Sequence, residues 1–181
     1  MLPPRYSLWV VPPHPLREAL RATIAEFARQ LDVPPFEPHV TLLGDLACSV
    51  EEATEGAREI GRAARPFAVD FEGTGSAEPF FRAAYLRVRR SSGLTEARVT
   101  AERILGHRAA EGDPFEPHLS LAYGSLDQAA KERIFETARS RGHVTTSFVA
   151  TRISLAESST EVPIDRWRIV EEVELGHPSP G

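Results

Sequence analysis

Two nearly identical eight-residue segments carry the side chains best suited to chemistry in this sequence. Pro35–Leu42 (PFEPHVTL) recurs as Pro114–Leu121 (PFEPHLSL), with six identical positions and the conservative exchanges Val/Leu and Thr/Ser. The copies lie 79 residues apart in a chain of 181, and each places a histidine two residues before a hydroxyl side chain. Because two copies are too few for a solenoid, this duplication predicts two related lobes that face each other.

We expect each segment to include a strand, in which side chains alternate between the two faces. His39 and Thr41 then point to one face, and His118 and Ser120 do the same in the second copy. The apolar residues between them point to the opposite face and into the core. If the two strands are neighbours, two imidazoles and two hydroxyls converge on one cleft.

Two imidazoles with two hydroxyls suit phosphoryl chemistry without a metal. An unperturbed histidine pKa of ~6.5 allows one ring to be neutral and the other charged near neutral pH. The neutral ring takes a proton from water, the charged ring gives one to the departing oxygen, and the hydroxyls hydrogen-bond the non-bridging phosphate oxygens. A cyclic phosphodiester fits because water attack opens its ring. We therefore interpret His39 and His118 as catalytic, and Thr41 and Ser120 as substrate-binding.

Other uses of the histidines have weaker support. His143 also precedes a threonine by two residues but lacks the Pro-Phe-Glu-Pro lead, so we expect it in an exposed loop or at a strand edge. A zinc site usually needs three ligands; no His-Glu-x-x-His occurs, and Cys48 has no partner nearby in the sequence. Glu37 and Glu116 can assist the histidines only if the strands continue through the prolines. We predict no metal and no cofactor. Surface positions are expected for His14, His107 and His177.

Composition is that of a globular protein, with 41% hydrophobic and 26% charged residues. The net charge is −5, and no run of five basic residues occurs. A long nucleic acid held through its backbone usually needs a basic stripe, so we expect a small-molecule partner instead. No apolar stretch approaches the ~20 residues of a membrane helix, and no secretory signal opens the chain. The single Cys48 excludes an intramolecular disulfide. We expect a cytoplasmic monomer.

Strands and helices alternate along the sequence, as judged from hydrophobic period and from capping and breaking residues. Ser49 and Asp127 are predicted N-caps. This order predicts an α+β or α/β domain with helices covering the sheet. The predicted strands are 6–11, 39–43, 67–71, 83–88, 118–123, 148–155 and 167–175, and the predicted helices are 14–31, 49–65, 92–105 and 127–140.

The duplicated motif resembles the hallmark of the two-histidine (2H) phosphoesterases. Within that group the chain looks most like the cyclic phosphodiesterases of the plant and fungal type, over roughly residues 5–175. Further likeness lies in Ser7–Pro12 (SLWVVP), in Phe80-Phe81 and in Pro117–Tyr123 (PHLSLAY). The resemblance implies an α+β fold, with one domain, 1–181, made of two intertwined pseudo-symmetric lobes of antiparallel sheet plus helices around a central cleft.

The resemblance also implies an activity. It is metal-independent hydrolysis of nucleoside 2',3'-cyclic phosphates to 2'-phosphates, and of ADP-ribose 1'',2''-cyclic phosphate to the 1''-phosphate, as in RNA and tRNA-splicing metabolism. It assigns His118 as general base and His39 as general acid, although the copies are too alike for the sequence itself to order them. Two alternatives stay open: an RNA-end cyclic phosphodiesterase or 2'-5' RNA ligase, and a non-catalytic nucleotide-binding module.

Three aromatic residues match the family's site less firmly. Trp9 matches the aromatic wall of the substrate site but also suits the core. Tyr123 matches a substrate-binding tyrosine, yet strand parity puts it on the apolar side unless the chain turns before Gly124. Phe81 can border the cleft, although we expect it in the core. Plant members often carry disulfides that one cysteine cannot form, which leaves the chemistry unaffected.

Overall fold

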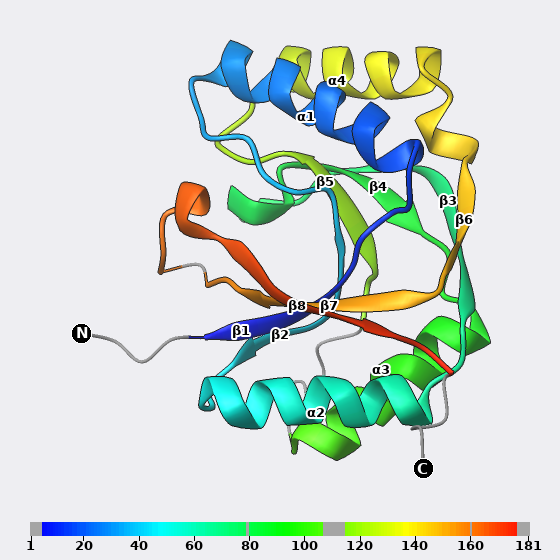
Figure 1. Ribbon diagram of the computed structural model, residues 1–181. Helices are drawn as coiled ribbons and strands as arrows, with labels where there is room; N and C mark the ends of the chain where they lie inside the picture. Colours follow the sequence, from blue (N-terminus) through cyan, green and yellow to red (C-terminus); the bar gives the residue numbers. More distant parts are fainter. Residues whose placement is uncertain (1–4, 79, 107–114, 160, 177–181) are drawn as a thin grey trace.

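Eight strands form one curled antiparallel sheet in the computed structural model, which describes residues 5–78, 80–106, 115–159 and 161–176 (Figure 1). The strands are β1 (Tyr6–Val10), β2 (Val40–Leu46), β3 (Phe67–Gly75), β4 (Ala84–Val88), β5 (His118–Ala122), β6 (Ser147–Ala150), β7 (Arg152–Glu157) and β8 (Arg168–Glu174). Their order in the sheet is β6-β3-β4-β5-β2-β1-β7-β8.

Four helices flank this sheet within the described residues: α1 (Leu16–Leu31), α2 (Val50–Ala63), α3 (Ser92–Leu105) and α4 (Gln128–Ser140). In Figure 1, α1 and α4 lie at the top, and α2 and α3, which pack against each other, lie at the bottom. Three short 3-10 turns complete the described chain: η1 (Phe80–Arg82), η2 (His143–Thr145) and η3 (Ile164–Arg166). The predicted α+β class is therefore confirmed, with an antiparallel sheet.

Both predicted N-caps are present. The Ser49 hydroxyl accepts a hydrogen bond from the Glu52 amide, and the Glu52 carboxylate accepts one from the Ser49 amide, which closes a capping box at the start of α2. The Asp127 carboxylate accepts from the Ala130 amide at the start of α4. Such caps satisfy amide groups that the first turn of a helix leaves without a partner.

The duplicated segments become neighbouring strands at the centre of the sheet. Val40 of β2 pairs with Leu119 of β5, and four strands lie on each side of this seam. Val40, Leu42, Leu119 and Leu121 are fully buried in the main core, as strand parity predicted. The expectation of two intertwined lobes stays a prediction.

Three predicted strand ranges are wrong by more than one residue. The strand expected over 39–43 runs on to Leu46, because β2 continues to pair with β1 as far as Tyr6. The single strand expected over 148–155 is two strands, β6 and β7, which separate at Thr151. They separate because β6 pairs with β3 at one edge of the sheet, whereas β7 pairs with β1 and β8 on the other half. Strand β3 also runs on to Gly75, beyond the expected end at Phe71, because it continues to pair with β4.

Among the described residues, no helix combines the length and the apolar character that crossing a membrane requires.

Candidate active site

The register of the central strands brings the two motifs face to face. Val40 pairs with Leu119. When that antiparallel register is continued by one residue in each direction, His39 lies opposite Ser120, and Thr41 lies opposite His118. Residues opposite each other in an antiparallel pair project to the same face. The two imidazoles and two hydroxyls therefore share one face at the seam.

A cavity of about 360 Å³ lies on this face. It combines the four motif side chains with aromatic, serine and charged residues from the neighbouring strands and turns. Its described lining comprises Ser7, Trp9, His39, Thr41, Gly44, Asp45, Phe81, Arg82, His118, Ser120, Tyr123, Ser158, Ser159 and Trp167. Every residue predicted for the site is thus placed on one cavity.

The two imidazole rings are held in the same way. His39 Nδ1 lies 2.6 Å from the Glu37 carbonyl oxygen, and His118 Nδ1 lies 2.8 Å from the Glu116 carbonyl oxygen. A carbonyl oxygen only accepts hydrogen bonds, so each Nδ1 carries the hydrogen. In the neutral rings Nε2 is then the nitrogen that can gain a proton. The glutamates thus orient the histidines through their main chain, whereas their carboxylates pair with arginines.

His39 is buried and stacks on Trp9, with ring centroids 3.8 Å apart. Burial lowers the pKa of His39 to about 4, because the charged imidazolium loses its hydration. The hydrogen bond to the Glu37 carbonyl acts in the opposite direction but is weaker, and a charge on His118 lowers the pKa further. His39 is therefore neutral at pH 7 in the free protein.

His118 is half-buried, and its ring lies 4.9 Å from the ring of Tyr85 on β4. Burial also lowers the pKa of His118, and the nearby Arg82 guanidinium adds to this effect. The Glu116 carbonyl and carboxylate oppose it, because both stabilise the imidazolium. Both rings thus have a pKa below the ordinary value in the absence of an anion.

Tyr123 lines the cavity despite the parity argument against it. Strand β5 ends at Ala122, and the next glycine, Gly124, adopts a φ of +127°. The Gly124 amide donates to the Phe80 carbonyl, which anchors the turn. Burial raises the pKa of the Tyr123 hydroxyl, and the Ser120 side chain acts in the opposite direction. The chain leaves the strand just before Gly124, so parity no longer applies at Tyr123.

Aromatic side chains form one wall of the cavity. Phe81, expected in the core, packs against a small buried hydrophobic cluster and also lines the cavity from η1, with its ring 5.7 Å from that of Trp167. Trp9 is almost completely buried and still borders the cavity. A position in the core and a position in the wall of the substrate site are therefore compatible for this residue. Trp167 lies 6.1 Å from both Trp9 and Tyr123, measured between ring centroids.

Sequence reasoning missed Trp167 and Arg82. Trp167 falls at the expected start of the last strand, and its indole nitrogen donates to the Ser159 carbonyl. Arg82 pairs with Glu116 at 2.6 Å, and its Nε is buried without a hydrogen-bond partner among the described residues. The signal for Arg82 was its place directly after Phe80 and Phe81, which the family resemblance already linked to the site. No sequence signal singled out Ser158 or Asp45.

The expected exposed position of His143 is wrong. The residue is buried rather than exposed, with its Nε2 3.0 Å from the Thr23 hydroxyl, and it does not line the cavity. It is buried because η2 packs against β3 and α4, which its sequence surroundings did not reveal. The His14 side chain is 79% exposed, as predicted. His107 and His177 lie outside the described residues.

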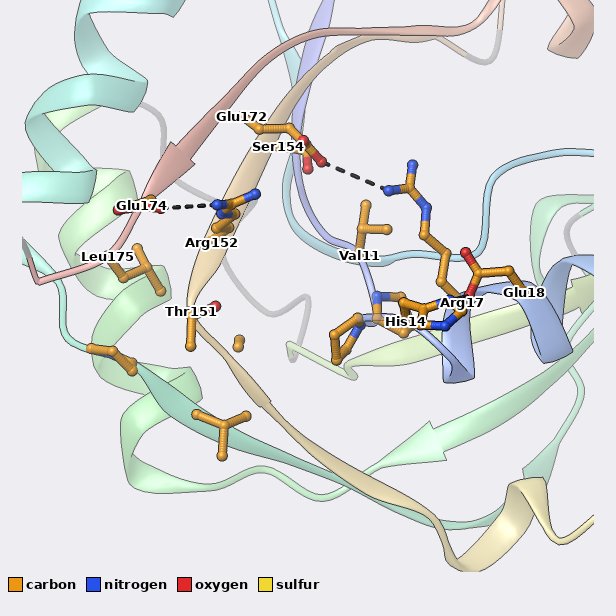
Figure 2. A pocket seen from close by; sticks show the side chains of 15 residues that line it. Val11, His14, Arg17, Glu18, Thr151, Arg152, Ser154, Glu172, Glu174 and Leu175 are labelled. Carbon is orange, nitrogen blue, oxygen red and sulfur yellow. Dashed lines mark hydrogen bonds and ion pairs between the residues drawn. The ribbon is translucent and has the colours of Figure 1, made fainter.

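A larger cavity of about 540 Å³ lies between the start of α1 and strands β7 and β8 (Figure 2). Its charged side chains pair with one another: Arg17 lies 3.9 Å from Glu172, and Arg152 lies 2.9 Å from Glu174. Its described lining includes one histidine, His14, and no second imidazole that could share a proton-transfer step with it. No cluster of three metal-ligating side chains occurs in the part of the chain that the structure describes.

Comparisons with known proteins place the chain in a family. The family model of the 2'-5' RNA ligase superfamily matches residues 11–161. A cyclic phosphodiesterase of Arabidopsis thaliana is 22% identical over 169 residues, which cover 91% of this chain and 92% of that protein. A 2',3'-cyclic-nucleotide 3'-phosphodiesterase of Phaeosphaeria nodorum is 27% identical over 195 residues, with 95% and 100% covered.

A solved structure has the same fold. E. coli LigT in complex with 3'-AMP superposes with a TM-score of 0.63 at 18% identity, covering 97% of this chain and all of LigT. The family match spans most of the chain and includes both histidine motifs. The chain therefore belongs to the 2'-5' RNA ligase superfamily, the two-histidine phosphoesterases.

Proposed function

We propose that the protein hydrolyses small cyclic phosphodiesters without a metal ion. The substrates are nucleoside 2',3'-cyclic phosphates, which give 2'-phosphates, and ADP-ribose 1'',2''-cyclic phosphate, which gives the 1''-phosphate. The observation that carries the proposal is that two imidazoles, held alike by main-chain carbonyls, line one cavity with two hydroxyls. The names of the Arabidopsis and Phaeosphaeria relatives support it.

In the proposed reaction, water attacks the phosphorus in line with the bond to the 3' oxygen. His118 Nε2 takes the proton from this water as the new P–O bond forms. The bond to the 3' oxygen breaks, and that oxygen receives the proton of His39 Nε2. The products are a 2'-phosphate and a free 3' hydroxyl, and the proton then returns from His118 to His39 through solvent. This assignment of acid and base follows the family resemblance.

The lowered pKa values of His39 and His118 determine how the general acid gains its proton at the start of the reaction. Both rings are neutral in the free protein near pH 7, because burial disfavours the imidazolium. A bound phosphodiester anion favours a charged ring beside it and so raises the pKa of the acid. Once protonated, a buried imidazolium with a low intrinsic pKa is a strong proton donor to the leaving oxygen.

The hydroxyls and the aromatic wall complete the substrate site in this proposal. Thr41 and Ser120 donate to non-bridging oxygens, which gain charge as water adds. The Ser120 hydroxyl donates to the Phe81 carbonyl at 3.2 Å in the free protein, so it rotates toward the phosphate when substrate binds. Trp9, Tyr123 and Trp167 offer flat apolar surfaces for the base or the ribose. LigT structures with 3'-AMP and with ATP support a small nucleotide ligand.

The test is incubation with 2',3'-cyclic AMP in the presence of EDTA. We expect 2'-AMP as product, at an unchanged rate with EDTA, and no turnover by His39→Ala or His118→Ala. Loss of turnover with EDTA would contradict the metal-free reaction. A 3'-phosphate product would contradict the assigned bond cleavage. Binding of 2'-AMP without turnover of any cyclic phosphate would favour a nucleotide-binding module instead.

A substrate panel separates the RNA-end alternative. An enzyme for RNA ends contacts several phosphates, so its affinity falls steeply with salt. The net charge of −5 disfavours this reading. We expect that replacing 2',3'-cyclic AMP by an RNA oligonucleotide with a 2',3'-cyclic phosphate end does not raise kcat/KM at 0.15 M salt.

A further inference from the structure

We propose a second anion-binding subsite beside His118, built by Arg82, Arg87 and Arg90, which binds a second phosphate group of the substrate. The inference rests on the proposed hydrolysis of cyclic phosphates and narrows the substrate class. It favours a cyclic phosphate that also carries a 5'-phosphate or a pyrophosphate over a plain cyclic nucleoside phosphate.

A separate cavity of about 320 Å³ adjoins the catalytic one. Arg82 lines both cavities, so it forms the border between them. The described lining of the second cavity is Glu72, Arg82, Tyr85, Arg87, Val88, Arg90, Glu116 and Pro117. The two cavities thus meet at Arg82, whose guanidinium pairs with the carboxylate of Glu116, the residue whose carbonyl orients His118.

The pairing of β4 with β5 places two residues of the second cavity on the same face of the sheet as the catalytic side chains. Arg87 of β4 pairs with His118 of β5, and Tyr85 pairs with Ser120. Paired residues project to the same face, with Cβ atoms roughly 5 Å apart. Arg87 is thus the direct cross-strand neighbour of His118. A phosphate bound by Arg87 lies near the reacting one, on the same nucleotide.

Gly75 makes room for these side chains. It pairs with Tyr85 across β3 and β4. A Cβ atom at Gly75 would lie 2.6 Å from the Tyr85 ring and 2.9 Å from Arg87 Nε. The absence of a side chain therefore allows Tyr85 and Arg87 to lie across β3. The Arg82 guanidinium carbon lies 5.6 Å from the centre of the Tyr85 ring. The Tyr85 side chain therefore contacts both Arg82 and the space that Gly75 leaves for Arg87.

The charges in this cavity do not cancel. Glu116 pairs with Arg82 at 2.6 Å, and Glu72 pairs at 3.4 Å with Arg89, which does not line the cavity. Arg87 is exposed and makes no ion pair or side-chain hydrogen bond with the residues that the structure describes.

Two further donor groups, on Arg90 and at the Nε atom of Arg82, make no hydrogen bond to a carboxylate among the described residues. Arg90 donates to the Phe115 carbonyl and forms no ion pair with the described residues. Arg82 Nε is buried without a hydrogen-bond partner among them. Guanidinium groups bind phosphate oxygens through paired, charge-assisted hydrogen bonds. Arg87 and Arg90, which form no ion pair with the described residues, and the unsatisfied Arg82 Nε beside the catalytic ring therefore form a phosphate subsite in a chain whose net charge is −5.

The test compares adenosine 2',3'-cyclic phosphate with the same compound carrying a 5'-phosphate. The wild-type protein is expected to prefer the 5'-phosphorylated substrate by roughly tenfold or more in kcat/KM, the size of one charge-assisted hydrogen bond. Arg87→Gln should reduce this preference to within about twofold of unity. The matched control is Arg152→Gln, which changes an exposed arginine of the other cavity and should keep the wild-type ratio.

The outcomes separate this inference from the proposed function. Turnover of both substrates with equal kcat/KM overturns the second subsite and leaves the hydrolase standing. An equal loss of preference in Arg152→Gln also overturns it, because general charge attraction would then explain the effect. A further preference for ADP-ribose 1'',2''-cyclic phosphate supports the subsite and identifies a pyrophosphate as its ligand.

If neither cyclic compound is hydrolysed, the proposed function fails, and the second subsite is then tested by measuring nucleotide binding alone. The measurement is then the Kd of adenosine 2',5'-bisphosphate against that of 2'-AMP, by calorimetry at 0.15 M salt. Roughly tenfold tighter binding of the bisphosphate that Arg87→Gln abolishes supports the subsite. Equal Kd values for the two nucleotides overturn it.

Discussion

Trp9 and His39 are stacked, with ring centroids 3.8 Å apart and ring planes 14° from parallel. The same Trp9 is the cross-strand partner of Thr41, so one side chain of β1 supports both functional residues of the first motif. The stack excludes water from one face of the imidazole. Burial is the main reason why the pKa of His39 falls to about 4. The tryptophan therefore contributes to the acid–base chemistry as well as to the wall of the cavity.

Replacement of Trp9 by leucine should raise the pKa of His39 toward ~6.5, because water then reaches the ring and stabilises the imidazolium. NMR titration of the His39 ring measures this pKa directly. Phe71→Leu, a change in a buried ring of β3 outside the cavity, is the control and should leave the His39 pKa unchanged. An unaltered His39 pKa in Trp9→Leu would show that the stack does not desolvate the ring.

The pH dependence of kcat/KM should be a bell with its maximum on the acid side of pH 6.5. This parameter reports the free enzyme, in which one ring must be protonated and the other neutral. The singly protonated form prevails between the His39 pKa of about 4 and the lowered pKa of His118. Activity falls at lower pH because the base is protonated, and at higher pH because the acid is lost.

This bell has the same shape whichever ring is the acid, since the two singly protonated forms titrate together. Initial rates at substrate concentrations far below KM, measured from pH 4 to pH 8.5, give the profile. A maximum at pH 7.5 or above would contradict the burial-driven pKa values. A profile without an acidic limb would contradict the need for a neutral base.

The hydroxyls of the two motifs should act in the transition state more than in substrate binding. Removal of one such donor typically lowers kcat by ~10²–10³. We expect a loss of this order for Thr41→Val and for Ser120→Ala, with KM changed by less than about threefold. Thr41→Ser keeps the hydroxyl and should retain most of kcat. A loss confined to KM would show that the hydroxyls bind ground state and transition state equally.

His143 offers a contrast between a structural and a catalytic histidine. Its buried hydrogen bond to Thr23 joins η2 to α1, so His143→Gln should lower the unfolding free energy by ~1–3 kcal/mol and leave kcat near the wild-type value. His39→Gln and His118→Gln should instead lower kcat by at least ~10². Urea unfolding and steady-state kinetics separate the two effects. A folded His143→Gln protein without activity would contradict the choice of catalytic pair.

The convergence of the motifs followed from sequence because it depends on local rules. Strand parity placed Val40 and Leu119 in the core, and the near-repeat indicated a cleft lined by both motifs if their strands are neighbours, as they are at the centre of the sheet. The caps at Ser49 and Asp127 were also predictable, since a cap is a contact within three residues.

The errors concern long-range packing. Nothing local to His143 shows that η2 packs on β3 and α4, so its burial was missed. The break at Thr151 arises because β6 and β7 join different halves of the sheet, which the sequence of residues 148–155 does not reveal. Arg82 and Trp167 reach the cavity from turns that are far in sequence from both motif strands, so the sequence did not show that they come together. Tyr123 depended on where a strand ends, which is among the least certain features of a sequence prediction.

The central claim is that both imidazoles contact the same phosphate. Titration of ¹⁵N-histidine-labelled protein with 2'-AMP, monitored by NMR at several pH values, tests it directly. The account predicts that the Nε2 signals of His39 and His118 shift with one common Kd, that both pKa values rise, and that the buried His143 does not respond. A response of only one of the two rings, or two different Kd values, would contradict the account.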